Sequence, residues 1–339
     1  MLSYRKLAMR VLGRPLHTEG IDSPRPASQR AAAFALTAAM LITLAAPAFA
    51  KTWHIEDGDI TVKAGDTKGT NKVSQGESTD VPDTDTVITN REKNASSNTV
   101  TIETNDKNDK VEVTLKDVNI DTSSRNKAAV SVTGEGDTNI KLDGDNALKS
   151  DIYRSGIYGS GSGSLTISGG ENDSLTAQGG SGANGISSSG SLTISGGTVT
   201  ANGDDGGRGI SSSGSVTISG GSTVTANGGN GTISGGDGIC SNGGVTISGG
   251  STVTANGGNG GSLVGGDGIR SGGGLTVSDG TVTAKGGNGD SKDGYGGDGI
   301  RSGGVTISGN TVNAAGGNGG KVGGYGICSF DRVAISGGT

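Results

Sequence analysis

The chain has 339 residues, of which 69 are glycine and only 3% are aromatic, and its formal net charge is −6. So few aromatic side chains argue against a conventional globular core. Residues 51–339 hold 21 of the 27 basic and 31 of the 33 acidic residues, a net charge of −10 with no visible basic patch. This balance argues against nucleic acid as a partner.

Residues 1–50 predict a signal peptide. Basic residues are scattered up to Arg30, residues 31–46 are apolar, and Ala48-Phe49-Ala50 has the small-x-small pattern of a cleavage site. The alternative is a membrane anchor, for which a stretch ending at Pro47 is short. No other segment is a candidate membrane span, so we expect a chain that is secreted or associated with the cell surface.

Residues 51–155 differ from the rest in composition, with 20 of the 31 acidic and 14 of the 21 basic residues that follow the leader. Alternating apolar and polar residues predict strands here. The predicted strands are 52–62, 85–90, 98–104, 110–121, 128–136 and 138–149. We interpret this region as irregular, charged coils and the polar cap that a stacked-repeat protein needs at its open edge. Trp53 is expected to close the end of the core.

Residues 156–339 contain repeated copies of one glycine-rich sequence motif, and each copy starts at a Gly-Ile pair. The isoleucines are Ile157, Ile186, Ile210, Ile239, Ile269, Ile300 and Ile327, spaced by 29, 24, 29, 30, 31 and 27 residues. A period of this length indicates stacked repeats. The spacing varies only in the segment before each Gly-Ile, so we expect loops at that corner.

Each copy contains three short segments that alternate with period 2. In the copy at 186–201 the residues expected to point inward are Ile186, Leu192, Ile194, Val199 and Ala201, and those expected outward are Thr193, Thr198 and Thr200. A helix is excluded, because glycine costs about 1 kcal/mol at each interior helix position and no 3.6-residue apolar period occurs. The pattern predicts an all-β fold, a parallel β-helix (β-solenoid) with three short strands per coil of about 24–31 residues and coils about 4.8 Å apart.

The sequence ends on VAISGGT, which matches the middle of a repeat. We therefore expect the repeats to be truncated at this end.

Outward threonines form the most regular predicted surface. One row contains Thr198, Thr223, Thr252 and Thr281, which Thr311 continues, and a second contains Thr200, Thr225, Thr254 and Thr283, which Asn313 continues. This ladder is similar to the Thr-x-Thr face of ice-binding solenoids, but threonine also suits any exposed strand. Asn202, Asn227 and Asn256 predict an asparagine ladder at the adjoining corner.

Three aspartates also recur at one place in successive copies, namely Asp237, Asp267 and Asp298. Stacked about 4.8 Å apart, their carboxylates repel each other unless a nearby positive charge offsets the repulsion. Arg270 and Arg301, each three residues after an aspartate, are one candidate source of this positive charge. A bound Ca²⁺ ion is the other. The register of calcium-binding nonapeptide repeats is not matched, and no other metal or cofactor is expected.

Catalysis is not expected. His54 is the one histidine after residue 50, and nothing around it suggests a nucleophile. Gly203-Asp204-Asp205 resembles the Asp-Asp motif of polygalacturonases, which are β-helix enzymes that degrade polysaccharides. The Asn-Thr-Asp, Gly-His-Gly and Arg-Ile-Lys motifs of that family do not occur here, and paired carboxylates alone cannot perform its acid–base chemistry.

Cys240 and Cys328 each follow a Gly-Ile pair directly, with Arg270 and Arg301 at the same place in the copies between them. The two cysteines therefore lie three coils apart, about 14 Å along the stack, which is too far for a disulfide. We expect both thiols to be free and to point outward.

TWHIEDGDITV, VTLKDVNID and IKLDGDNALKSD, together with the repeated GI…LTISGG…TVTA phrase, resemble secreted bacterial proteins labelled "carbohydrate-binding domain-containing". The resemblance implies a β-helix, export and sugar binding, but it carries over no individual binding residues. Two functions stay open. The first is a structural or adhesion solenoid that contacts a glycan or protein on a host or neighbouring cell, and the second is a carbohydrate-binding module.

Overall fold

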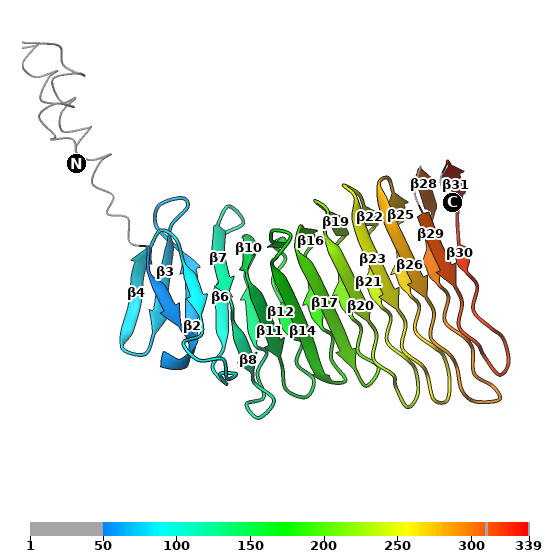
Figure 1. Cartoon of the computed structure of the whole chain (residues 1–339), viewed down its shortest axis with the longest axis horizontal. Coiled ribbons are helices and arrows are strands. Elements are labelled where there is room, and N and C mark those ends of the chain that lie inside the picture. Colours follow the sequence, from blue (N-terminus) through cyan, green and yellow to red (C-terminus); the bar gives the residue numbers. More distant parts are fainter. Residues whose placement is uncertain (1–49, 309–310, 338–339) are drawn as a thin grey trace, which may run out of the picture. The chain divides into compact units, whose positions relative to one another are not determined.

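We describe a computed structural model of the chain, covering residues 50–308 and 311–337. The described residues form a β-solenoid built from three sheets, which run side by side along the stack (Figure 1). The expected signal peptide lies outside the described residues except for Ala50, which is exposed. In the part of the chain that is described, no helix is both long and apolar enough to cross a membrane.

We call the three sheets A, B and C. Sheet A contains β1 (Thr52–His54), β5 (Val87–Thr89), β7 (Lys110–Lys116), β10 (Asp137–Asp143), β13 (Leu165–Ser168), β16 (Leu192–Ser195), β19 (Val216–Ser219), β22 (Val245–Ile247), β25 (Leu275–Val277), β28 (Val305–Ser308) and β31 (Val333–Ser336). Sheet B contains β2 (Ile60–Ala64), β3 (Asn71–Gln75), β4 (Ser78–Asp83), β6 (Val100–Glu103), β9 (Val130–Thr133), β12 (Ile157–Gly159), β15 (Ile186–Ser188), β18 (Ile210–Ser212), β21 (Ile239–Ser241), β24 (Ile269–Ser271), β27 (Ile300–Ser302) and β30 (Ile327–Ser329). Sheet C contains β8 (Asn119–Asp121), β11 (Asp145–Lys149), β14 (Ser174–Ser181), β17 (Thr198–Asp204), β20 (Thr223–Asn227), β23 (Ser251–Asn256), β26 (Gly280–Lys285) and β29 (Thr311–Ala315).

Each regular coil contributes one strand to sheet B, then one to sheet A, then one to sheet C, as β15, β16 and β17 do. Strands of successive coils pair in parallel, and Ile186 lies beside Ile157 on one side and Ile210 on the other. This confirms the predicted parallel β-helix with three strands per coil. The solenoid forms because a single coil buries too little apolar surface to be stable alone, and stacking joins the coils into one core.

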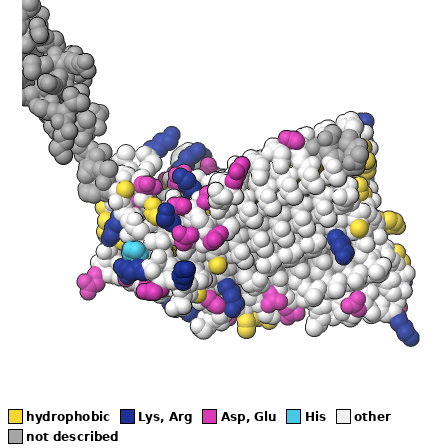
Figure 2. Space-filling view, viewed as in Figure 1, with side chains coloured by type: hydrophobic (Ala, Val, Ile, Leu, Met, Phe, Trp, Pro, Cys, Tyr) yellow, Lys and Arg dark blue, Asp and Glu magenta, His cyan; other side chains and the backbone are white. Residues whose placement is uncertain are grey.

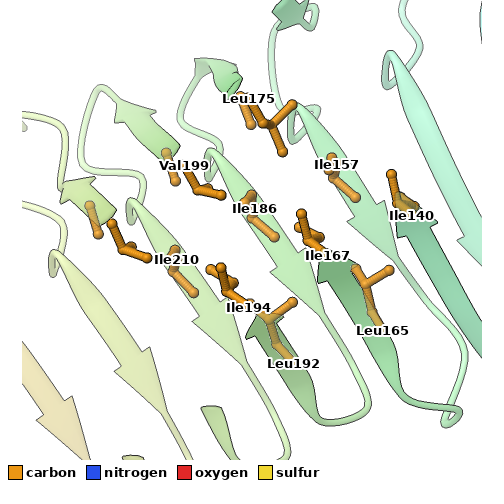
Figure 3. Close-up of a cluster of buried hydrophobic side chains, with 14 of the residues drawn as sticks. Ile140, Ile157, Leu165, Ile167, Leu175, Ile186, Leu192, Ile194, Val199 and Ile210 are labelled. Carbon is orange, nitrogen blue, oxygen red and sulfur yellow. The ribbon is translucent and has the colours of Figure 1, made fainter. Parts of the chain in front are cut away.

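The core is a continuous column of small aliphatic side chains (Figure 3). Ile186, Leu192, Ile194, Val199 and Ala201 are all fully buried, as their alternation predicted. The threonines between them point outward and are exposed or half-buried.

The N-terminal coils depart from the predicted strands where a turn interrupts the alternation. Residues 52–62 form two strands rather than one, separated by a 3₁₀ turn, η1 (Ile55–Asp57), and by Gly58 with φ of +136°. The expected strands 110–121 and 138–149 are likewise each divided, at Asp117 with φ of +50° and at Gly144 with φ of +72°. Left-handed backbone of this kind ends a strand.

The first coil carries an antiparallel hairpin that the sequence did not predict. Strands β3 and β4 extend sheet B beyond β2 with antiparallel pairing. Trp53, on the first strand of sheet A, is 2% exposed. Its indole Nε1 donates a 2.7 Å hydrogen bond to Asp83 at the end of β4. The hairpin and this tryptophan therefore lie together at the N-terminal end of the stack.

Most of the variation in coil length lies at the corner between sheets C and B, as expected, although the other corners also vary, for example 169–173 against 196–197 between sheets A and C. The connecting segments between sheets C and B are 205–209, 228–238, 257–268, 286–299 and 316–326. Backbones of successive segments pack tightly: a Cβ added to Gly236 would lie 1.9 Å from the carbonyl oxygen of Gly207. Glycine is therefore required at this contact.

Candidate functional site

The predicted threonine ladder exists in the expected register on the outer surface of sheet C. Thr198, Thr223, Thr252 and Thr281 form one continuous row of paired positions, and Thr200, Thr225, Thr254 and Thr283 form the second. We call these eight residues the threonine face. The first row and Thr283 are exposed, and the other three threonines are half-buried.

The threonine face is an uncharged lattice. Neighbouring strands lie about 4.8 Å apart, so each row presents hydroxyl and methyl groups at that interval. Figure 2 shows charged side chains gathered over the N-terminal coils, whereas the middle and C-terminal coils present a mostly uncharged surface in this view. The face can accept and donate hydrogen bonds repeatedly along a flat partner. The array that ice binding would need is present, and ice binding stays a prediction.

The asparagine ladder beside the threonine face is confirmed. Asn227 Nδ2 donates to Asn202 Oδ1 at 2.8 Å, and Asn256 Nδ2 donates to Asn227 Oδ1 at 2.8 Å. These bonds tie successive coils together, so they stabilise the edge of the threonine face.

The aspartate row is a second ladder at the opposite end of the corner segments. Asp237, Asp267 and Asp298 are 5–6% exposed. Asp237 Oδ1 accepts a 2.9 Å hydrogen bond from the backbone N–H of Asp267, whose Oδ1 in turn accepts a 2.8 Å bond from Asp298. Each carboxylate therefore satisfies the backbone of the next coil. The row begins with an amide in the same role, since Asn184 Oδ1 accepts from the backbone N–H of Arg208 at 2.8 Å.

One arginine lies beside each of the three aspartates. Arg270 and Arg301 approach Asp267 and Asp298 to 3.9 Å and 3.6 Å, as the sequence predicted. The first partner was missed: Arg208 Nε donates a 3.2 Å hydrogen bond to Asp237 Oδ2, across 29 residues. The aspartates are thus compensated by arginines and backbone amides.

Burial, together with the neighbouring carboxylates of Asp237 and Asp298, raises the pKa of Asp267, in the middle of the row, to about 6. Within residues 50–308 and 311–337 no group of three or more His, Cys, Asp or Glu side chains is arranged to hold a metal ion. Calcium binding at this row stays a prediction without a ligand cluster to support it.

Neither of the other polar motifs is assembled into a catalytic arrangement. Asp204 and Asp205 are exposed at a tight turn, where Ser181 Oγ donates to Asp205 at 3.1 Å. His54 is half-buried at the end of β1, far along the stack from these aspartates, and a hydrogen-bond partner for its Nδ1 is missing among the described residues. The expectation that the chain is not an enzyme stays a prediction.

The two cysteines occupy equivalent positions three coils apart, in the paired series Cys240, Arg270, Arg301, Cys328, and both are free thiols. Cys240 lies outside the apolar core cluster but is only 7% exposed, so its outward direction does not make it accessible. Burial raises the pKa of both thiols.

Sequence reasoning also missed a groove on the outer surface of sheet A, about 450 Å³ in volume. Outward side chains of β7, β10 and β13 line its floor, including Lys110, Glu112 and Asn139. Its wall is held by Asn71, whose Nδ2 donates 2.7 Å and 2.9 Å hydrogen bonds to the Glu112 carbonyl oxygen and to Thr86 Oγ1. Because this wall belongs to the unpredicted hairpin region, no periodic signal could have indicated it.

The chain matches no family model, no curated protein and no solved structure. The fold and its surfaces are therefore the basis for any functional assignment: the chain is a repeat protein with a β-solenoid fold.

Proposed function

We propose that this chain is a secreted or surface-exposed, non-enzymatic solenoid that adheres to a glycan or protein on a host or neighbouring cell. The threonine face is its proposed contact surface. The observation that carries the proposal is the unbroken register of the two threonine rows over β17, β20, β23 and β26. A repeated, uncharged surface held by a rigid stack can make many weak contacts at once, and their sum gives avidity.

The test is a binding assay of the full chain on cell surfaces and on a glycan array. The variant Thr225→Lys with Thr254→Glu places opposite charges at paired positions of sheet C, where they tolerate each other. The matched control, Thr217→Lys with Thr246→Glu, makes the same change at equally half-buried paired positions of sheet A. Loss of binding in the first variant alone supports the proposal, and equal binding by both variants contradicts it.

Carbohydrate binding is the second candidate, and the groove on sheet A favours it. Its lining mixes donors and acceptors, with Asn139 Nδ2 bonded to Glu112 at 2.9 Å and Lys110 3.9 Å from Asp137. Such a lining can pair with the hydroxyl groups of a sugar. Glycan binding that Asn139→Ala abolishes, while the Thr225→Lys, Thr254→Glu variant retains it, would favour this function over the first.

A further inference from the structure

We propose that the cavity beside Arg208, Arg270 and Arg301 binds the carboxylate or sulfate groups of an acidic polysaccharide. The cavity has a volume of about 550 Å³, and all three arginines line it. They are three of the four arginines between residues 156 and 339, in a region with few basic residues. This concentration of positive charge on one surface has no counterpart in the threonine face.

The three arginines come from different parts of the chain and are brought together by stacking. Arg270 and Arg301 are paired positions on β24 and β27, so their backbones lie about 4.8 Å apart. Arg208 reaches the cavity from the segment before β18 and is anchored on Asp237. An elongated anion lying along the stack would therefore meet one guanidinium after another.

Each arginine has an acidic neighbour, and two of these, Asp237 and Asp267, line the cavity as well. The aspartates are, however, much less exposed than the arginines. The side chains of the three aspartates are 7–8% exposed, whereas those of Arg208, Arg270 and Arg301 are 43%, 51% and 41% exposed. Each aspartate Oδ1 accepts a backbone N–H of the next coil. One oxygen of each carboxylate is therefore occupied by the backbone, and the guanidinium group is the more solvent-exposed partner in each ion pair.

The guanidinium groups of Arg270 and Arg301 retain hydrogen-bonding capacity. Their distances to the paired carboxylates, 3.9 Å and 3.6 Å, exceed a hydrogen bond. An arginine has five N–H donors in a planar fork that matches the oxygens of carboxylate and sulfate. These two side chains can therefore form bidentate bonds to an incoming anion.

A second, adjoining cavity of about 310 Å³ gives space for the uncharged part of such a ligand. Arg270 and Arg301 border it as well, together with Asn242 and the ring of Phe330. Phe330 is 72% exposed, and its ring centroid lies 5.2 Å from Arg301 Cζ. An exposed aromatic ring beside an amide provides an apolar surface and a hydrogen-bonding group for a sugar ring. The saccharide nature of the ligand rests on the proposed function, whereas the anion site rests on the arginines alone.

The experiment measures binding of the full chain to three polymers: polygalacturonate, which carries carboxylates, dextran sulfate, which carries sulfates, and neutral dextran. We expect one or both anionic polymers to bind and neutral dextran not to bind, with affinity falling as salt increases. The polymer that binds tighter identifies the preferred anion. Equal binding of neutral dextran would contradict the proposal.

The decisive variant is Arg270→Gln with Arg301→Gln, which should lower the affinity for the bound polymer at least tenfold. Arg332→Gln is the matched control, because this exposed arginine lines neither cavity, and it should leave the affinity within twofold. Arg270→Lys with Arg301→Lys keeps the positive charge but loses the planar guanidinium group that can form two parallel hydrogen bonds to one anion. An intermediate affinity is therefore expected. Unchanged affinity in the glutamine variant would overturn the proposal.

A second variant separates binding from folding. Adding Asp267→Asn and Asp298→Asn to the glutamine variant removes the carboxylates that would otherwise lose their arginines, and keeps the side-chain oxygens that bond the next coil. This variant should melt at or above the temperature at which the parent chain melts, and still not bind. The Thr225→Lys, Thr254→Glu variant should bind the anionic polymer normally. Loss of cell adhesion in that variant with anion binding intact would show that the two surfaces act separately, and failure of one proposal would leave the other standing.

Discussion

The indole of Trp53 and the carboxylate of Asp83 form a buried pair at the N-terminal end of the solenoid, with a 2.7 Å hydrogen bond from Nε1 to Oδ2. Asp83 is fully buried and its Oδ1 also accepts from the backbone N–H groups of Lys51 and Asp85. One carboxylate thereby joins the first strand of sheet A to the end of the hairpin.

Replacing Asp83 by alanine should destabilise the cap. The change leaves a buried indole N–H and two backbone N–H groups without their acceptor, at a cost of about 2–4 kcal/mol. Chemical denaturation monitored by tryptophan fluorescence measures it, because Trp53 is the one tryptophan of the chain. Asp85→Ala, at an exposed side chain two residues away, is the control. If the denaturation midpoint moved equally in both variants, the assigned role of Asp83 would be contradicted.

Replacing Ile239 by aspartate should unfold the neighbouring coils. Ile239 is fully buried between Ile210 and Ile269, and an unpaired carboxylate there is strongly unfavourable. Thr225→Ser, on the outer surface, should change stability by less than about 0.5 kcal/mol. Thermal unfolding followed by circular dichroism compares the two. Equal shifts would mean that the inward and outward assignments are wrong.

The stability of the aspartate row should depend on pH. The pKa of Asp267 is about 6 in the folded chain and about 3.9 in an unfolded one. Between these values the folded state holds a proton that the unfolded state has lost, so the contribution of this group to stability falls as pH rises through the window. By pH 7 this group lowers the free energy of unfolding by about 3 kcal/mol relative to its value at low pH, where Asp267 is protonated in both states.

Asp267→Asn isolates this effect from the other carboxylates of the chain. The asparagine keeps a side-chain oxygen for the backbone N–H of Asp298 but carries no buried charge, so the variant should be more stable than the parent at pH 8. At pH 4, where Asp267 is protonated, the advantage should disappear. Urea denaturation at both values is the measurement, and a variant that is less stable at pH 8 would refute the assignment.

Both thiols should be recovered free by mass spectrometry of alkylated, non-reduced monomer. Cys240 and Cys328 are separated by Arg270 and Arg301 in one paired series, about 14 Å along the stack. Cys328, which is partly exposed, should react faster than the buried Cys240. A linked Cys240–Cys328 peptide from monomer would mean that the strand register is different.

The sequence by itself determined the coil, the direction of its side chains and the rows they form. Period-2 alternation fixes which face a residue such as Ile194 or Thr200 lies on, and repetition at a nearly constant spacing fixes which residues stack. Both are properties of the local chain, so the threonine face, the asparagine ladder and the equivalence of the cysteines could be predicted without coordinates.

Only the tertiary structure decided the contacts between irregular segments. The hairpin of β3 and β4, the bond from Trp53 to Asp83 and the pairing of Arg208 with Asp237 each join residues whose relative positions depend on loop geometry. Such segments have no period, and a side chain there finds its partner only when the stack brings both together. The cavity beside Arg208, Arg270 and Arg301 is therefore a property of the folded solenoid, although every residue that lines it belongs to the repeat region or its loops.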